Sequence, residues 1–252
     1  MAIFVTMMMM GLLLGFVGAG GSGFIISILT TFFGIPIHIA LGTSLAAMVL
    51  TSLSGAFSHY REQNVVVPVG LPVGFFGMIG AFSGSRIAHI IPELQLTWFT
   101  ASMLFLSAFL FWLRIFTPFG KMIATKYGNI TPKGVKFWVS AAGLGIVTGM
   151  LSGMFGIGSS TFIQIGLLVF FGFSVRQSVG TTLFIILPIA FVGGFGYYTI
   201  GNLDVQLLVK VAAGTMIGSY LGAKCTNRLH PMILKIALVT VPTIGGLLLL
   251  IG

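Results

Sequence analysis

A glycine-punctuated apolar segment occurs twice in this chain of 252 residues. The glycines at positions 11, 15, 18 and 20 return at positions 149, 153, 156 and 158, with mostly apolar residues between them. Each of these pairs is separated by 138 positions, a distance that we call the repeat offset. The same offset relates further pairs along the chain: Gly42 to Gly180, Asn64 to Asn202 and Gly80 to Gly218. The chain is therefore an internal duplication, and the two halves are expected to fold alike.

The composition places both halves in a lipid bilayer. Hydrophobic residues make up 57% of the chain, charged residues make up 6%, and the mean hydropathy is +1.13. A chain with so few polar groups cannot cover itself with a polar surface in water. We therefore expect an all-α polytopic membrane protein whose surroundings are the lipid bilayer.

Six apolar runs have the length of about 20 residues that a single helix needs to cross the hydrocarbon core. They lie at residues 39–59, 65–87, 94–116, 175–199, 203–224 and 231–251. Two further segments, at residues 3–33 and 136–172, are too long for single crossings. As straight helices they would measure about 46 Å and 55 Å, against a core of about 30 Å. We expect both to break at their glycines.

Basic residues set the expected orientation of the chain. The net charge is +9, but the basic side chains are sparse and sit between apolar runs, so they indicate topology and not a nucleic-acid partner. The densest group joins the two halves: Arg114, Lys121, Lys126, Lys133 and Lys136. This connection is predicted to be cytoplasmic, because cytoplasmic loops carry the excess of lysine and arginine.

The same rule favours a re-entrant hairpin over a single crossing for residues 136–172. Only a hairpin returns the next group of basic residues to the cytoplasm: Arg176, Lys224, Arg228 and Lys235. Three cations, Arg86, Lys210 and Lys224, either face the transport pathway or extend to the interface. The sequence leaves these two alternatives open.

Each half is thus expected to contain a re-entrant or broken helical hairpin followed by three transmembrane helices. The odd number of crossings inverts the second repeat relative to the first, as in transporters whose site lies where the repeats meet. We assign residues 1–116 to the first transmembrane repeat, 117–135 to the basic cytoplasmic connection and 136–252 to the second repeat. Both termini are predicted to lie outside the cytoplasm.

The two expected breaks hold the first candidate substrate-binding residues. They are Gly20, Gly21 and Ser22 at the first break, and Gly158, Ser159 and Ser160 at the second. A helix that begins at such a break presents unpaired N–H groups and a partial positive charge, and glycine lets an anion approach the backbone. Glycine can equally serve only to thin or kink a crowded helix, so both interpretations stay open.

A second set of candidate substrate-binding residues lies on the helices that follow the breaks. It comprises Thr43 and Ser44 in the first half, and Gln164, Thr181 and Thr182 in the second. The hydroxyl groups either line a polar path or bond back to their own helix. Gln164 needs a polar partner in the bilayer, and substrate contact and interhelical bonding are both open to it.

The scarcity of acidic residues constrains the mechanism. Glu62, Glu93 and Asp204 are the only carboxylates of the chain, and all lie at or near predicted connections. Proton coupling would therefore use histidine, the protonation of the substrate or an acid in a loop; otherwise the protein is a uniporter or a channel. Because the chain lacks a His-Glu-x-x-His motif and a plausible carboxylate dyad, we expect no enzyme activity, no metal and no cofactor.

The repeated glycine motifs, spaced ahead of Gly42-Thr43-Ser44-Leu45 and Gly180-Thr181-Thr182-Leu183, resemble the TauE/SafE family of sulfite-exporter-like permeases. The resemblance covers nearly the whole chain. It implies an inner-membrane transporter of sulfite, of sulfonates such as sulfoacetate, or of other organosulfur anions. The chain departs from the family pattern where Ser22 and Ser159-Ser160-Thr161 interrupt the glycine runs, and no proline follows either tip. A passive anion channel and a non-transporting assembly partner are the alternatives, and the oligomeric state is not indicated.

Overall fold

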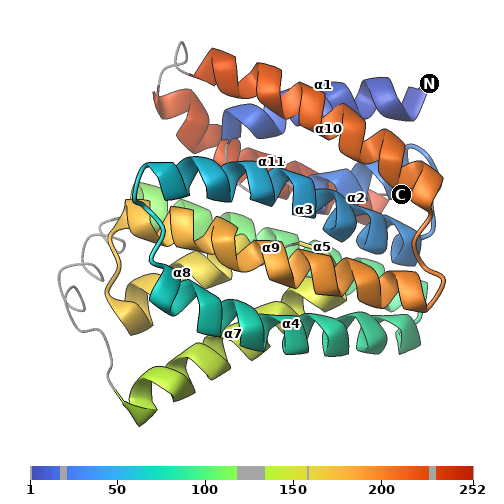
Figure 1. The fold of residues 1–252 in the computed structure, drawn as a ribbon. Coiled ribbons are helices and arrows are strands. Elements are labelled where there is room, and N and C mark those ends of the chain that lie inside the picture. The colour runs from blue at the N-terminus through green and yellow to red at the C-terminus, as the bar shows by residue number, and fades with distance from the viewer. Residues whose placement is uncertain (1, 18–21, 118–133, 158, 227–230, 252) are drawn as a thin grey trace.

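The structure is a computed structural model that describes residues 2–17, 22–117, 134–157, 159–226 and 231–251 (Figure 1). Within these ranges every regular element is a helix, which confirms the predicted all-α fold. The helices are α1 (Ala2–Val17), α2 (Ser22–Thr31), α3 (Ile37–Arg61), α4 (Val67–Ile90), α5 (Glu93–Phe116), α7 (Val135–Phe155), α8 (Ser160–Phe171), α9 (Val175–Thr199), α10 (Val205–Thr226) and α11 (Pro231–Ile251).

Both long apolar segments break where the glycines predict. The first hairpin consists of α1 and α2, and the second consists of α7 and α8. At the second break, the amide of Gly156 donates to the Ser152 carbonyl at 2.8 Å and Gly156 then takes a left-handed φ of 64°. Ser159 also has a positive φ, of 44°. A right-handed helix cannot pass through such residues, so α7 ends here and α8 starts anew.

The six predicted crossings coincide with α3, α4, α5, α9, α10 and α11, with only small differences at the helix ends. In the described residues, five helices are long and apolar enough to span a membrane, namely α3, α4, α5, α9 and, beyond the predicted crossings, α7. The 21 residues of α7 rise about 31 Å, whereas the 12 residues of α8 rise about 18 Å. The second hairpin is therefore unequal, with one leg of full membrane length, because the break lies past the middle of the segment.

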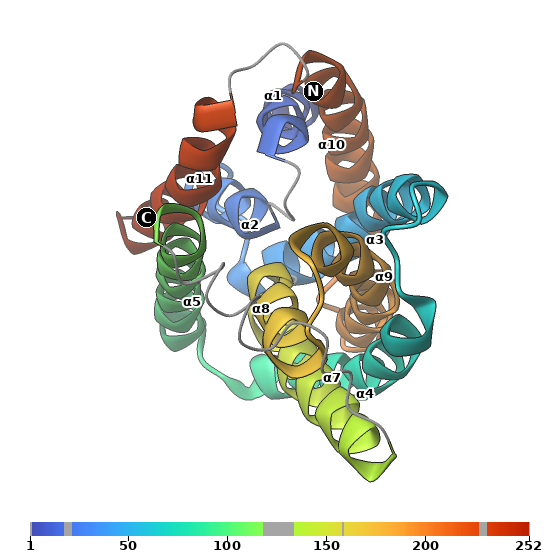
Figure 2. The same ribbon diagram turned by 90° about the vertical axis from the view of Figure 1, so that its left-hand side faces the viewer.

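The two hairpins enter the bundle from opposite ends. In Figure 1, α1 starts at the end where both termini lie and α2 turns back toward it, while α7 starts at the other end, where α5 finishes. Figure 2, which looks nearly along the helices, shows α2 and α8 toward the centre of the bundle. The first residues of α2 and of α8 are buried in this interior.

The duplication is visible in two equivalent helix pairs. The first helix of each repeat packs on the fourth helix of the other, α1 on α10 and α7 on α4. A Cβ added to Gly218 would lie 2.0 Å from the carbonyl oxygen of Met8, and one added to Gly80 would lie 2.3 Å from that of Ile146. Met8 and Ile146 are themselves related by the repeat offset. Only glycine permits backbones to approach this closely.

The crossing of α3 and α9 obeys the same equivalence. A Cβ on Gly42 would lie 2.6 Å from the carbonyl oxygen of Asn202, and a Cβ on Gly180 would lie 2.7 Å from that of Asn64. Each glycine thus packs on the turn that follows the equivalent helix of the other repeat. The boundaries assigned to the two repeats and to their connection stay a prediction, since residues 118–133 lie outside the described residues.

Candidate functional site

A small cavity lies between the N-terminal turns of α2 and α8. Its volume is about 30 Å³, and its walls come from α2, α5, α8, α11 and Ile157 of the second break. The polar side chains in these walls are Ser107 of α5 with Ser160 and Thr161 of α8, and Gly23 of α2, which belongs to the same half of the chain as Ser107, also lines the cavity. Because a water needs about 10–15 Å³, the cavity holds roughly two waters or one compact solute.

The cavity sits near the middle of the helices that enclose it. Ser107 lies close to the centre of α5 (Glu93–Phe116), and Pro242 lies close to the centre of α11 (Pro231–Ile251). Both helices have the length of a membrane crossing. A solute held here would lie about halfway along these helices.

The N-terminal turn of α8 carries free main-chain donors. Its first intrahelical bond runs from the Ile163 amide to the Ser159 carbonyl, at 2.9 Å, and no side chain caps the turn. The preceding amides of the turn therefore have no acceptor within the helix. Ser159, Ser160 and Thr161 are all buried, so water does not screen the partial positive charge of this helix end.

The N-terminus of α2 is the similar helix N-terminus in the first repeat. Ser22, its first residue, is buried, and its hydroxyl has no hydrogen-bond partner. Gly23 follows and lines the cavity. The predicted site residues Gly20, Gly21 and Gly158 lie outside the described residues. The structure thus brings Ser22, Ser160 and the cavity into one region.

The hydroxyl residues of α3 and α9 divide into two classes. Thr181 accepts a hydrogen bond from the Val66 amide at 3.0 Å, at the start of α4, and Ser44 donates to the Leu41 carbonyl at 2.9 Å. Thr43 and Thr182 are equally buried, but their hydroxyls have no partner. None of the four contributes to the cavity wall. Thr181 and Ser44 therefore form hydrogen bonds within the protein, whereas the hydroxyls of Thr43 and Thr182 are unpaired.

Ser44 and Gln164 also contact protein groups. The Ser44 hydroxyl lies 3.4 Å from the Gly156 carbonyl, which ties α3 to the tip of the second hairpin. Gln164 is buried on α8 and has a polar partner, as the sequence requires of an amide in the bilayer. A role of either residue in binding stays a prediction.

The structure adds two buried hydroxyls that the sequence did not single out. Ser107 lines the cavity, and Ser152 lies in the last turn of α7 with its hydroxyl unpaired. The repeat offset pairs Ser107 with Gly245, and Ser152 with Leu14. Neither serine recurs in the other repeat, so the duplication carried no signal for them.

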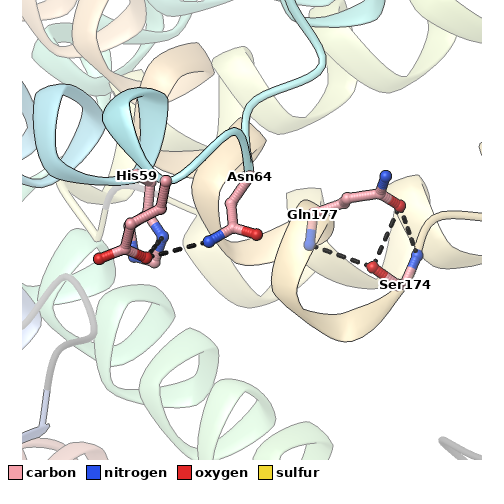
Figure 3. A network of polar contacts seen from close by, with 5 residues as sticks. His59, Asn64, Ser174 and Gln177 are labelled. Atoms are coloured by element: carbon pink, nitrogen blue, oxygen red, sulfur yellow. Dashed lines mark hydrogen bonds and ion pairs between the residues drawn. The ribbon is translucent and has the colours of Figure 1, made fainter.

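Charged side chains gather at the ends of the bundle. Figure 3 shows one such group: Glu62 accepts a hydrogen bond from Asn64 at 3.0 Å and lies 3.8 Å from the imidazole Nδ1 of His59. The nearby capping box of Ser174 and Gln177 starts α9. All three carboxylates lie in or beside connections, as predicted, since Glu93 begins α5 and Asp204 accepts hydrogen bonds from two amides at the start of α10.

The described cations stay away from the cavity. Arg86 is exposed with its guanidinium 4.8 Å from the Phe82 ring centroid, and Lys210 is exposed on α10. The side chain of Lys224 lies outside the described residues. Among the residues that are described, no cluster of three or more His, Cys, Asp or Glu side chains suits a metal ion. The cavity thus offers hydrogen-bond donors and helix dipoles, without a formal charge.

Comparison with known proteins agrees with this architecture. The family described as "Sulfite exporter TauE/SafE" matches residues 3–249. The "Probable membrane transporter protein YdhB" of Bacillus subtilis is 50% identical over 99% of this chain and 100% of its own length. The "Probable membrane transporter protein MJ0441" of Methanocaldococcus jannaschii is 28% identical over 96% of this chain and 91% of its own. No solved structure matches. The chain therefore belongs to the TauE/SafE family of membrane transporters.

Proposed function

We propose that the protein is a secondary transporter of a small sulfur-containing anion, sulfite or an organosulfonate such as sulfoacetate. The anion binds in the cavity between the N-terminal turns of α2 and α8. One observation carries this proposal: the uncapped, buried N-terminal turn of α8 adjoins a partly open cavity near the middle of the bundle, with Ser160 and Thr161 in its wall.

The binding chemistry follows from the donors around the cavity. Main-chain N–H groups and serine or threonine hydroxyls donate hydrogen bonds to the oxygens of the anion, and the helix dipole favours its negative charge. These interactions are stronger in a water-excluded site than in solution. The absence of a cation from the described wall suits transport, because a solute that forms no ion pair is released more easily.

The size of the cavity discriminates between the candidate anions. A volume of about 30 Å³ suits a compact oxyanion such as sulfite. An organosulfonate has additional carbon atoms and would require the walls to move apart. We therefore expect sulfite to bind more tightly than sulfoacetate to the conformation described here.

The candidate ligands remain those that the sequence predicts, with Ser107 and Thr161 added. Gly20, Gly21 and Gly158 would bring the backbone close to the anion at the two tips. Thr43 and Thr182, whose buried hydroxyls are unpaired, would serve the anion on its way to or from the cavity.

We further propose that the two halves are inverted repeats that alternate access to the site. The opposite entry of α1 and α7 in Figure 1 supports this view, as do the matched glycine contacts of the two repeats. In such a transporter the two repeats exchange conformations, and the site opens first to one side of the membrane and then to the other.

The basic residues support an orientation with both termini outside the cytoplasm, in the cell inner membrane. Arg61, Lys136 and Arg176 all lie at helix ends on the side of the bundle opposite the termini (Figure 1). By the positive-inside rule this side is cytoplasmic. Reporter fusions at each terminus test the orientation, and activity of a cytoplasmic reporter at both termini would overturn it.

A passive channel or uniporter would use the same cavity, whereas an enzyme is not expected, since the relatives carry transporter names.

Thermal unfolding of the purified protein with sulfite, thiosulfate, sulfoacetate, taurine and sulfate tests binding, because a ligand of the folded state raises the apparent stability. We expect sulfite to stabilise most. A panel without any stabilising anion would contradict the proposal. Uphill uptake into proteoliposomes under an imposed ion gradient separates a secondary transporter from a channel.

A further inference from the structure

One side chain of α9 holds the end of α7 that leads into the cavity. Tyr197 is fully buried, and its hydroxyl donates a hydrogen bond to the Gly153 carbonyl at 2.9 Å and lies 3.5 Å from the Met154 carbonyl. These are among the last carbonyls of α7, which have no donor within the helix. The hydroxyl therefore satisfies a buried helix end that would otherwise lack a partner.

The Gly153 carbonyl lies four residues before Ile157, which is part of the cavity wall. Shortly after it, Gly156 turns the chain, and the next residue, Ile157, lines the cavity. A Cβ on Gly156 would lie 2.8 Å from the Leu41 side chain and 3.0 Å from that of Ile26, so α2 and α3 enclose this turn closely. A shift at the end of α7 would therefore displace Ile157 and with it this part of the cavity wall.

The first repeat has the same backbone at this place but a different side chain. The main-chain N–H of Asn202 donates a hydrogen bond to the Tyr197 carbonyl at 2.9 Å. The main-chain N–H of Asn64 donates to the His59 carbonyl at the same distance. The repeat offset makes His59 the counterpart of Tyr197. Its Nδ1 has no hydrogen-bond partner, and it lies 3.8 Å from Glu62 (Figure 3). Of the two equivalent residues, Tyr197 forms a hydrogen bond to a hairpin, and His59 does not in the described residues.

We propose that Tyr197 is a positioning residue for anion binding. By holding the Gly153 carbonyl, its hydroxyl sets where the first turn of α8 places the donors of Ser160 and Thr161 relative to the cavity. Tyr197 does not touch the anion. This inference rests on the proposed function of the cavity as an anion site.

The test removes the hydroxyl and keeps the ring. In Tyr197→Phe we expect the dissociation constant for sulfite to rise about tenfold, as the loss of one buried hydrogen bond predicts. Tyr198→Phe is the matched control, because Tyr198 is the next residue and is largely exposed on the outer face. This control should bind sulfite as the wild type does.

The apparent melting temperature without ligand is measured for each variant alongside the affinity. If Tyr197→Phe melts at a lower temperature but binds sulfite with unchanged affinity, the tyrosine is only structural and the proposal is overturned. If the wild type binds no anion at all, the proposed function itself fails, and this result is distinguishable because it does not depend on the variant.

A second measurement covers the case in which Tyr197→Phe does not fold. A single 3-fluorotyrosine at position 197 keeps the hydroxyl and the shape of the side chain. Because the hydroxyl is joined through the end of α7 to the cavity, saturation with sulfite should shift its fluorine resonance. A resonance that does not move while sulfite binds would overturn the proposal, and a 3-fluorotyrosine at position 198 serves as the control.

Discussion

The contact of α4 with α9 and the contact of α10 with α3 are equivalent by the duplication, yet they differ in packing. Side chains fill the contact of α4 with α9, which we call the closed side, whereas a groove remains between α10 and α3, which we call the open side. On the closed side, a Cβ on Gly70 would lie 2.8 Å from the Phe184 ring, and one on Gly74 would lie 3.1 Å from Pro188. Glycines on α4 thus accept large side chains of α9.

On the open side, the equivalent positions carry Leu208 and Ala212 on α10, and Ala46 and Leu50 on α3. These residues line an apolar groove of about 620 Å³. Large and small side chains do not interlock here as they do between α4 and α9. The comparison teaches that a duplicated backbone can keep the same crossings while side-chain volume decides which of them close.

The largest effect is expected where the two repeats are most alike. In Gly218→Ala the new Cβ would meet the Met8 carbonyl oxygen at 2.0 Å, so α1 and α10 must separate. We expect a loss of about 2–4 kcal/mol of stability, or no folded protein. Gly80→Ala should cost a similar amount in the first repeat.

Gly143→Ala is the control for both glycine variants. Gly143 lies within α7 and has nothing within 4 Å of an added Cβ, so alanine should stabilise by about 0.5–1 kcal/mol. Thermal unfolding in detergent measures all three proteins. A tolerated Gly218→Ala beside a damaging Gly80→Ala would break the equivalence of the two helix pairs.

The next largest effect concerns the serines that start α2 and α8. Ser160→Ala removes a hydroxyl from the cavity wall, and we expect sulfite affinity to fall about tenfold, or about 1.4 kcal/mol. Ser22→Ala should weaken binding less, because Ser22 is not part of that wall. Isothermal titration with sulfite measures both variants.

Ser83→Ala is a suitable control for the serine variants, since the Ser83 hydroxyl is exposed and bonds back to the Ile79 carbonyl. Its affinity for sulfite should equal that of the wild type. A larger loss in Ser22→Ala than in Ser160→Ala would move the centre of the site from the second hairpin to the first.

A smaller effect is expected from filling the open groove. Ala46→Phe installs the side chain that Phe184 provides on the closed side, and its added apolar area should raise stability by about 1 kcal/mol or less. Sulfite affinity should stay unchanged, because the groove and the cavity share no lining residue. A lower melting temperature would contradict this expectation and would show that the groove does not accommodate a phenylalanine ring.

The smallest effect is expected from His59→Phe. His59 forms no hydrogen bond to a hairpin in the described residues, so sulfite affinity should change less than about twofold, in contrast to Tyr197→Phe. Equilibrium binding of sulfite to both variants measures the difference. Equal losses in the two variants would mean that His59 and Tyr197 act alike, and that the asymmetry between the repeats has no consequence for binding.

Much of the fold was predictable because its signals are local or periodic. The breaks follow from glycines in segments too long for one crossing, and Gly156 with its left-handed φ shows why the break falls there. Which helices pair was not predicted, but the equivalence of the α1–α10 and α7–α4 contacts follows from the duplication, since their glycines recur at one offset. The family was predictable for the same reason.

The composition of the cavity wall was not predictable in this way. Helix α7, for example, is almost equally apolar on all its sides, so its sequence does not indicate which side faces the interior. Ser107 reaches the cavity, whereas Thr181 caps the start of α4. Both are single hydroxyls in apolar surroundings, and only the packing of neighbouring helices distinguishes them.

By itself, the amino-acid sequence determined that this protein is a duplicated helical membrane protein with two interrupted segments, because hydropathy, length and glycine spacing are properties of the chain. The tertiary structure alone decided that Tyr197 binds the end of α7 and that α10 leaves a groove against α3. These features depend on the volumes and hydrogen bonds of side chains brought together from distant parts of the chain, which no local pattern records.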